Sequence, residues 1–331
     1  MEKPIKARTD KRMTDGEITS FIDEQVAILR EKMSGGAKIL CALSGGVDSA
    51  VTAALIHKAV PENLVCVFID HGLMRLREPE KIVKVYKDER GLNLIHVDAS
   101  KRFLAALRHV SEPERKRKII GEEFIRVLED EGRNLGKIDY LAQGTIYADL
   151  LESGAVDGKH VKTHHNVAIP PNIEFKEIIE PLKMLYKDEV RRVGVALGLP
   201  NKMVYRQPFP GPGLGVRTLG EITPKKLETV RMADSIFRDE IEAAGLDQKI
   251  WQYFAILTEA RSTGVRDGVR VYGYTVALRA VNSIDAVTAE FADIPFSVLQ
   301  KASSRIVNEV PDVHRVVYDI TSKPPSTIEW E

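Results

Sequence analysis

A short segment, Ser44-Gly45-Gly46-Val47-Asp48-Ser49, constrains the fold more than any other part of this sequence. The apolar run 39–43 precedes it directly and is too short for a buried helix, and the alanine-rich run 50–56 follows it. Two glycines between such runs predict a strand, a tight turn and a helix. The turn then lies at a helix N-terminus, where backbone N–H groups lack intrahelical partners and the helix dipole is positive. Because glycine lets an anion approach the backbone, the segment predicts a phosphate-binding loop.

Composition limits the class of protein. The chain has 331 residues, which is enough for about two domains with proper cores. Lys plus Arg (48) equals Asp plus Glu (48), so no overall charge attracts nucleic acid or an anionic membrane. No apolar stretch has the length of a membrane span, and Cys41 and Cys66 both lie in apolar runs typical of buried, reduced thiols. We therefore expect a cytoplasmic protein that binds neither nucleic acid nor membrane.

Apolar runs alternate with helical patterns along the first 200 residues. Strands are predicted at 64–69, 92–97 and 138–142, and helices at 77–90, 114–131 and 186–197. Thr14 and Glu17 have the spacing of a capping box, which predicts that the first helix begins there. Continuous apolar strands between helices indicate the α/β class, with a doubly wound parallel sheet that binds ligands at the carboxyl ends of its strands.

A second domain follows a segment, 206–217, that is too rich in proline and glycine for a regular element. We expect one domain at 14–200 and another at 201–331. In the second, helices are predicted at 224–244 and 297–309, and strands at 250–257, 269–281 and 313–320. This irregular alternation predicts a smaller α+β domain. The chain ends with two prolines and a tryptophan, which is atypical of a fraying terminus and indicates an anchored one.

Two carboxylates follow the predicted strand at 138–142. If Thr145 caps a short helix, Asp149 and Glu152 lie three residues apart on one face and can hold a hard cation such as Mg²⁺. On spacing alone, two solvated helix carboxylates remain the alternative. The polar segment 154–180 comes next, and its length for an irregular connection predicts a lid over the site.

The motifs resemble those of a known family. The pattern Ser-Gly-Gly-x-Asp-Ser resembles the PP-loop of ATP pyrophosphatases, whose fold is adenine nucleotide alpha hydrolase-like. Together with the segments 143–153, 162–166, 206–217 and 316–331, it resembles the GMP synthetase family from about Phe21 to the last residue. Nothing before residue 21 resembles a glutamine amidotransferase domain, so the resemblance is to the ATP-pyrophosphatase subunit of the two-subunit, glutaminase-less type.

The resemblance implies an ATP-dependent amination of XMP to GMP. An adenylyl-XMP intermediate would form, pyrophosphate and AMP would be released, and Mg²⁺ would assist. Ammonia would come from a separate glutamine amidotransferase subunit, and the second domain would be a dimerisation domain that forms a homodimer. Both ATP and XMP would be substrates.

The resemblance also implies roles for individual residues. The residues implied to bind ATP are Ser44, Gly45, Gly46, Val47, Asp48, Ser49 and Gly144. Those implied to be catalytic are Asp149, Glu152 and Lys162, the first two as ligands of Mg²⁺. Those implied to bind XMP are Arg117, His164, His165, Asn166, Gln252, Arg315, Lys323, Ile328 and Glu329. Arg117 lies in a basic run, 115–118, that would ordinarily be a solvated helix face, and Asp267 departs from the family pattern and is left out.

Three other functions are alternatives to this one. NAD synthetase also uses ammonia and transfers AMP, and tRNA thiolases use the same loop with sulfur. The thiolases commonly carry a spaced cysteine pair, which this sequence lacks, and its neutral charge does not favour tRNA. A non-catalytic ATP sensor would have no need of Asp149, Glu152 and a lysine on a lid.

Overall fold

The structure is a computed structural model that describes residues 12–152, 175–283 and 287–331. The chain divides into two compact units. The first unit comprises residues 1–69, 80–98 and 124–206, and the second comprises residues 70–79, 99–123 and 207–331. In the described ranges, no helix is long and apolar enough to cross a membrane. The expected division between residues 200 and 201 stays a prediction.

The first unit is built on a five-stranded sheet with the order β3-β2-β1-β4-β5. The strands are β1 (Ile39–Leu43), β2 (Leu64–Asp70), β3 (Leu94–Asp98), β4 (Tyr140–Ala142) and β5 (Glu177–Ile179). β1 pairs in parallel with both β2 and β4, and β4 pairs in parallel with β5. The predicted doubly wound parallel sheet is therefore confirmed. Its strand order reverses between β1 and β4, which makes their carboxyl ends the expected ligand site.

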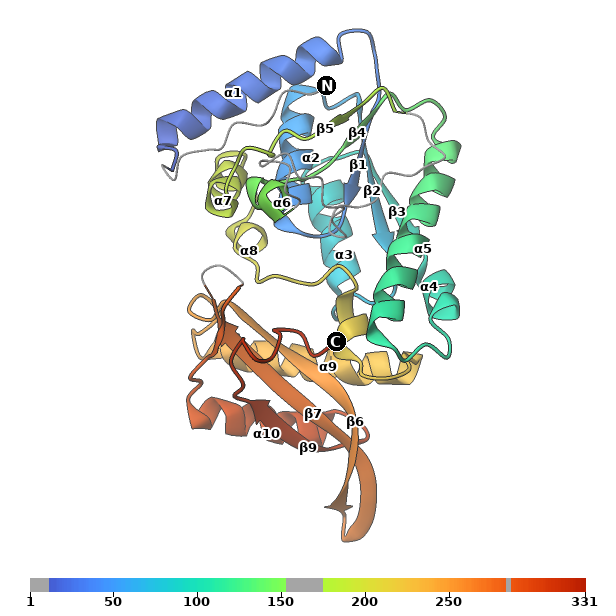
Figure 1. Cartoon of the computed structure of the whole chain (residues 1–331), viewed down its shortest axis with the longest axis vertical. Coiled ribbons are helices and arrows are strands. Elements are labelled where there is room, and N and C mark those ends of the chain that lie inside the picture. Colours follow the sequence, from blue (N-terminus) through green and yellow to red (C-terminus); the bar gives the residue numbers. More distant parts are fainter. Residues whose placement is uncertain (1–11, 153–174, 284–286) are drawn as a thin grey trace. The chain divides into compact units, whose positions relative to one another are not determined.

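Helices lie on both sides of this sheet in Figure 1, with α1, α2 and α7 on one side and α5 on the other. The helices up to residue 204 are α1 (Asp15–Lys32), α2 (Val47–Ala59), α3 (Glu78–Val83), α4 (Ser100–Ala106), α5 (Pro113–Asn134), α6 (Tyr147–Glu152), α7 (Lys187–Ala196) and α8 (Asn201–Val204), and a π-helical stretch, Lys84–Glu89, extends α3. α2 is buried from Ser49 to Ile56 because α1, α7 and β1 all pack against it. Its small, apolar side chains suit a helix enclosed in this way.

Some local predictions are confirmed and others are wrong. Thr14 caps α1, and its hydroxyl accepts the N–H of Glu17 while the Glu17 carboxylate accepts the N–H of Thr14, as the capping box predicts. Thr145 is not the N-cap of α6, because the helix begins at Tyr147 and Ile146 occupies the position before it; the hydroxyl of Thr145 donates to Glu180 at 2.6 Å. The predicted irregular segment 154–180 contains strand β5 near its end, where apolar residues at 178 and 179 extend the sheet.

The second unit contains a four-stranded sheet and two long helices. Its elements are a 3-10 helix (Gly213–Arg217), α9 (Pro224–Ala243), β6 (Gln252–Arg266), β7 (Val269–Asn282), β8 (Glu290–Phe291), α10 (Phe296–Glu309) and β9 (Val313–Asp319). β7 is central: it pairs antiparallel with β6 and β8, and in parallel with β9. The predicted smaller α+β domain is confirmed, and the 3-10 helix corrects the expectation that 206–217 holds no regular element.

Both faces of β6 are covered over its first half, which explains why Gln252 to Thr258 are all buried although alternate side chains point to opposite faces. On one face Tyr253 meets Phe237 of α9, with the ring centroids 6.2 Å apart. On the other face Phe254 and Ile256 form a cluster on which Ile328 packs. The last residues of the chain therefore act as the second cover of this sheet.

The capping box yields a prediction about α1. Thr14→Ala should lower the free energy of unfolding by about 1 kcal/mol, because the N–H of Glu17 loses its acceptor. Urea denaturation followed by circular dichroism measures the change. Ser20→Ala is the matched control, since it removes an exposed hydroxyl from the same helix without touching the cap. Equal losses in the two variants would contradict the role of the cap.

Candidate functional site

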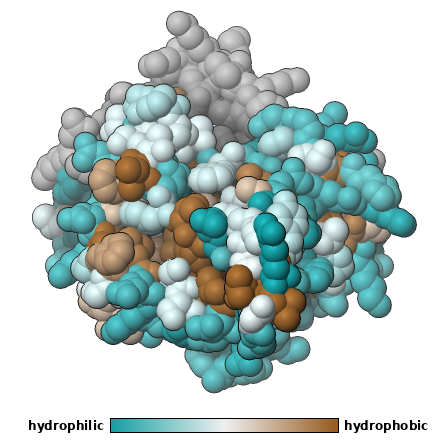
Figure 2. Space-filling view, turned by 90° about the horizontal axis from the view of Figure 1, so that it is seen from below, coloured by the Kyte–Doolittle hydropathy of each residue, from teal (hydrophilic) through white to brown (hydrophobic). Residues whose placement is uncertain are grey.

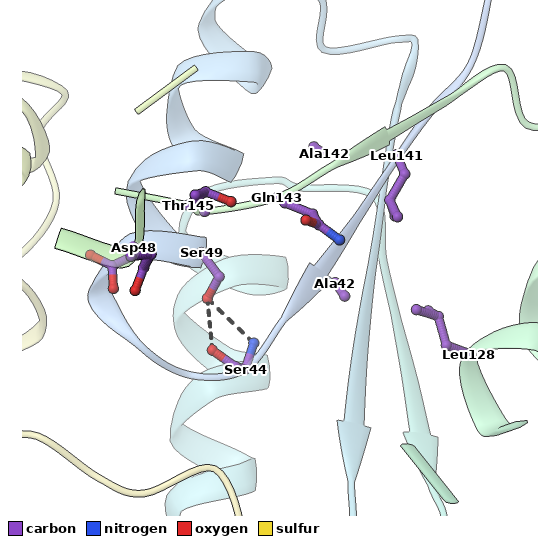
Figure 3. A pocket seen from close by; sticks show the side chains of 11 residues that line it. Ala42, Ser44, Asp48, Ser49, Leu128, Leu141, Ala142, Gln143 and Thr145 are labelled. Atoms are coloured by element: carbon purple, nitrogen blue, oxygen red, sulfur yellow. Dashed lines mark hydrogen bonds between the residues drawn. The ribbon is translucent and has the colours of Figure 1, made fainter. Parts of the chain in front are cut away.

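A pocket in the first unit lies at the carboxyl ends of β1 and β4, where the strand order reverses. Its volume is about 200 Å³, and Figure 3 shows it from close by. The residues that line it are Ala42, Ser44, Asp48, Ser49, Leu128, Leu141, Ala142, Gln143, Gly144, Thr145 and Asp149. The wall is polar where the two strands end and apolar beside them. The structure thus brings together the expected ATP-binding residues that follow β1 and those that follow β4.

The predicted phosphate-binding loop has the geometry that its sequence indicates. Gly45 has φ +76°, a left-handed conformation that favours glycine, and Gly46 is the N-cap of α2. The hydroxyl of Ser49 donates to the carbonyl of Gly46 at 3.2 Å, and it accepts the N–H of Ser44 at 3.3 Å. These bonds hold the loop closed around the first turn of α2, where the helix dipole favours an anion.

Two cations that the sequence analysis missed hold this loop in the first unit. Lys187 Nζ lies 2.8 and 2.6 Å from the two carboxylate oxygens of Asp48, and the guanidinium of Arg206 donates to the carbonyl of Gly45. Lys187 is the first residue of α7, where a positive charge opposes the helix dipole. That unfavourable position is the signal that could have indicated a partner elsewhere.

The expected metal ligands occupy α6. Asp149 lines the pocket, and its Oδ2 accepts the N–H of Ile146 at 2.8 Å. Glu152 is the last residue of α6, but its side chain lies outside the described part of the structure. Lys162, His164, His165 and Asn166 fall within 153–174 and also lie outside the described residues.

Among the expected XMP-binding residues, Gln252 and Glu329 meet in the second unit. Gln252 Nε2 donates to Glu329 Oε1 at 3.1 Å. Ile328 packs against the cluster around Phe254, and the main chain of Lys323 pairs with that of Ala289.

The remaining two lie at different places in the same unit. The guanidinium of Arg117 donates to the main-chain oxygen of Glu331. Arg315 is exposed on β9 and pairs with none of the other expected XMP-binding residues for which the structure describes side chains.

The basic run at 115–118 is not simply a solvated face. Lys116 is fully buried, and its ammonium binds the carboxylate of Glu331 and the carbonyl of Thr218, the latter at 2.8 Å. Burial lowers the pKa of Lys116, and the hydrogen bond to Glu331 opposes this lowering. Sequence reasoning missed Lys116 because its partners lie about 100 and 200 residues further along the chain.

The close approach of Gly144 to the phosphate-binding loop can be tested. A Cβ at this position would lie 2.9 Å from the carbonyl carbon of Asp48 and 3.0 Å from the nitrogen of Ser49, so Gly144→Ala must displace the loop. We expect ATP affinity to fall by about tenfold or more, as measured by isothermal titration. Gly121→Ala in α5 is the control, because a Cβ there meets no atom within 4 Å. Unchanged ATP affinity in Gly144→Ala would contradict the site.

Comparisons with known proteins find two separate regions of similarity to family models. Residues 239–330 match the family model of the GMP synthase C terminal domain, and residues 37–89 match that of the tRNA methyl transferase HUP domain. The chain is 59% identical over 318 residues to a GMP synthase [glutamine-hydrolyzing] of Clostridium tetani, and 56% identical to one of Geobacillus kaustophilus. Each match covers 96% of this chain and 62% of the relative, so the chain spans less than two thirds of the relatives' length.

Among solved structures, an NH3-dependent NAD synthetase from Campylobacter jejuni has a TM-score of 0.45 at 16% identity, covering 72% of this chain and 90% of that one. A likeness at this level adds nothing to the fold described above. Together the family models and the sequence identities show that the chain is similar to GMP synthases over 96% of its length, with residues 37–89 similar to a HUP domain and residues 239–330 similar to the GMP synthase C terminal domain.

Proposed function

We propose that this chain carries out the synthetase part of the GMP synthase reaction, the ATP-dependent amination of XMP. The observation that carries the proposal is the phosphate-binding loop of Ser44 to Ser49, placed at the reversal point of a parallel sheet, in a chain 59% identical to a GMP synthase over 318 residues. The same identity favours this reaction over that of NAD synthetase.

ATP would bind in the pocket of the first unit. The N-terminus of α2 would hold the pyrophosphate, because its N–H groups and dipole favour negative charge. The apolar wall beside it, with Ala42, Leu128 and Leu141, suits the face of a purine ring. Lys187, paired with Asp48, adds positive charge beside the loop and keeps the Asp48 carboxylate from repelling the phosphates.

Mg²⁺ fits the donors of this pocket. Carboxylate oxygens are hard ligands, and Asp149 lines the pocket beside the loop. Within 12–152, 175–283 and 287–331 no cluster of three or more metal-ligating side chains occurs, so the ion would depend on Asp149, Glu152 and phosphate oxygens together, as Mg²⁺ commonly does. When bound, it would neutralise charge on the departing pyrophosphate.

The reaction would proceed in two displacements. The O2 oxygen of XMP attacks the α-phosphorus of ATP, pyrophosphate leaves, and adenylyl-XMP forms. Ammonia then attacks C2 and loses a proton, AMP leaves, and GMP results. Lys162, in the part of the proposed lid that precedes β5, would stabilise the charge that develops on the α-phosphoryl group.

XMP would be held by residues of two kinds. Among the residues outside the described part, His164, His165 and Asn166 would donate hydrogen bonds to it. In the second unit, Lys323 would bind its phosphate as a cation, and Gln252 and Glu329 would face the rest of the nucleotide.

Ammonia would come from a separate glutamine amidotransferase subunit, and the enzyme would work in the cytoplasm. We also propose that the second unit forms a homodimer. The far end of the β6–β7 hairpin carries exposed Val265, Val269 and Tyr272, at 75%, 63% and 65% exposure. Figure 2 shows brown, apolar patches among hydrophilic residues on the face that it views. Apolar surface of this kind is typical of protein interfaces.

The proposed reaction has a direct test. The purified chain with ATP, Mg²⁺ and ammonium should convert XMP to GMP, with AMP and pyrophosphate released in equal amounts, as measured by chromatography. The rate at fixed total ammonium should rise with pH, because ammonia and not the ammonium ion carries the attacking lone pair. Nicotinate adenine dinucleotide in place of XMP is the control substrate. AMP release with the dinucleotide but not with XMP would support NAD synthetase instead.

The metal-binding role of Asp149 gives another prediction. Asp149→Asn keeps the size of the side chain and removes its charge, so the rate of AMP transfer at saturating substrates should fall by about a hundredfold. The melting temperature should change little, because the amide oxygen can still accept the N–H of Ile146. Rate and stability are measured on the same preparation. A normal rate would leave Asp149 only its structural role, as the acceptor of the N–H of Ile146.

A further inference from the structure

Among the residues of the second unit that the structure describes, three cationic side chains are fully buried: Lys116, Arg217 and Arg279 each have a relative exposure of 0%. Burial of a cation is unfavourable unless acceptors compensate it. All three find acceptors in one stretch of chain, residues 319–331, which we call the C-terminal segment. This stretch holds three of the expected XMP-binding residues, Lys323, Ile328 and Glu329.

Arg279 fixes the course of the C-terminal segment. An arginine has five N–H donors, and Arg279 makes five hydrogen bonds. Its acceptors are Asp319 Oδ2 at 2.6 Å, the carbonyls of Ile328 at 2.8 Å, Thr327 at 2.9 Å and Thr321 at 3.0 Å, and Ser326 Oγ at 3.2 Å. Most of these acceptors are main-chain oxygens, so Arg279 mainly fixes the path of the backbone. It does not orient a side chain toward a ligand.

Arg217, in contrast to Arg279, binds one side chain of the C-terminal segment with two hydrogen bonds. Its Nε and Nη2 donate to the two oxygens of Glu329, at 3.0 and 2.8 Å, and its Nη1 finds no acceptor in the part of the chain that the structure describes. The guanidinium carbon lies 3.8 Å from the ring centroid of Phe254 and 5.3 Å from that of Phe209. The two rings fix the plane of the guanidinium, and its forked donors then fix the plane of the Glu329 carboxylate.

Glu329 in turn fixes the orientation of the Gln252 side chain. Its Oε1 accepts from Arg217 and also from the Gln252 side chain at 3.1 Å. An ionised carboxylate only accepts, so the Gln252 atom that faces it must be the amide nitrogen. The Gln252 carbonyl oxygen is thereby turned away from Glu329 as an acceptor for a ligand N–H, such as those of a xanthine ring.

We propose that Arg217 is a positioning residue for XMP: by holding Glu329 in a two-bonded pair, it sets the orientation of Gln252 and of the C-terminal segment before the nucleotide binds. The inference rests on the proposed function. Arg217 would act only through Glu329 and would not touch the reacting atoms. Its loss should therefore weaken the binding of XMP and leave the binding of ATP unchanged.

Arg217→Lys tests the two parallel hydrogen bonds to Glu329. Lysine keeps the positive charge, but it cannot make two parallel bonds or stack on Phe254. We expect the KM for XMP to rise by about tenfold or more, with kcat at saturating XMP within about twofold of the natural chain and the KM for ATP unchanged. Steady-state assays of AMP release, with each substrate varied in turn, measure all three constants.

Further variants separate positioning from folding. Arg217→Met combined with Glu329→Met replaces the buried pair by apolar groups, which is commonly neutral for stability, so this chain should fold. Because Arg217 acts only through Glu329, the KM for XMP of this double variant should match that of Glu329→Met alone. Val230→Ala, at a fully buried position of α9, is the matched control: it should lower the melting temperature and leave the KM for XMP unchanged.

The outcomes discriminate between the hypotheses. The positioning role would be overturned by a KM for XMP within twofold of the natural value in Arg217→Lys, by a KM for XMP in the double variant well above that of Glu329→Met alone, or by a KM for ATP that rises in parallel. A raised KM for XMP in Val230→Ala would show that loss of stability alone explains the effect. If the natural chain turns over XMP, the proposed function stands whatever the variants show. If it does not, both the proposed function and this inference fail.

Discussion

The unpaired backbone N–H groups at the start of α2 are the constraint on which the first unit depends. An anion can reach them only if the preceding loop is small and left-handed, which Gly45 provides, and only if the helix is held firmly against the sheet. The burial of α2 between α1, α7 and β1 provides that support. Because β1 and β4 are neighbours in a parallel sheet, the residues after β4 arrive beside the same N–H groups, and one pocket results.

The second unit depends on a different balance, between the burial of cations and the acceptors that compensate it. Phe254 and Ile256 need a cover on the face of the sheet away from Tyr253 and α9, and the last residues of the chain supply it. That cover brings carbonyls and carboxylates into an apolar setting, where each must be paired. Arg217 and Arg279 pair them from the underlying structure, so buried hydrogen bonds hold the end of the chain on the sheet that it covers.

The sequence predicts an interaction well when its residues lie close together along the chain, and poorly when they lie far apart. The strands of the parallel sheet, the glycine loop and the capping box at Thr14 depend on residues within a few positions of one another, and these predictions hold. The ion pair of Lys187 with Asp48 spans 139 residues, and that of Lys116 with Glu331 spans 215. No sequence pattern within a few residues of either partner indicates such an ion pair. Strand β5 was missed for a related reason, since a strand of three residues is defined by its neighbour β4 and not by its own periodicity.

The place of the C-terminal segment in the fold changes how its role in binding can be studied. Its proline-rich sequence and final tryptophan indicate an anchored end, and Trp330 indeed donates to Asp319 at 2.9 Å. Removal of residues 328–331 would delete Glu329, but it would also take Glu331 from Lys116 and uncover Phe254. Buried cations left without partners are strongly destabilising, so a truncated chain would lose stability together with any ligand contact. A segment that is ordered before binding costs a ligand little entropy to engage. For the same reason, its ligand contacts can be separated from its structural ones only by side-chain changes that leave the segment in place.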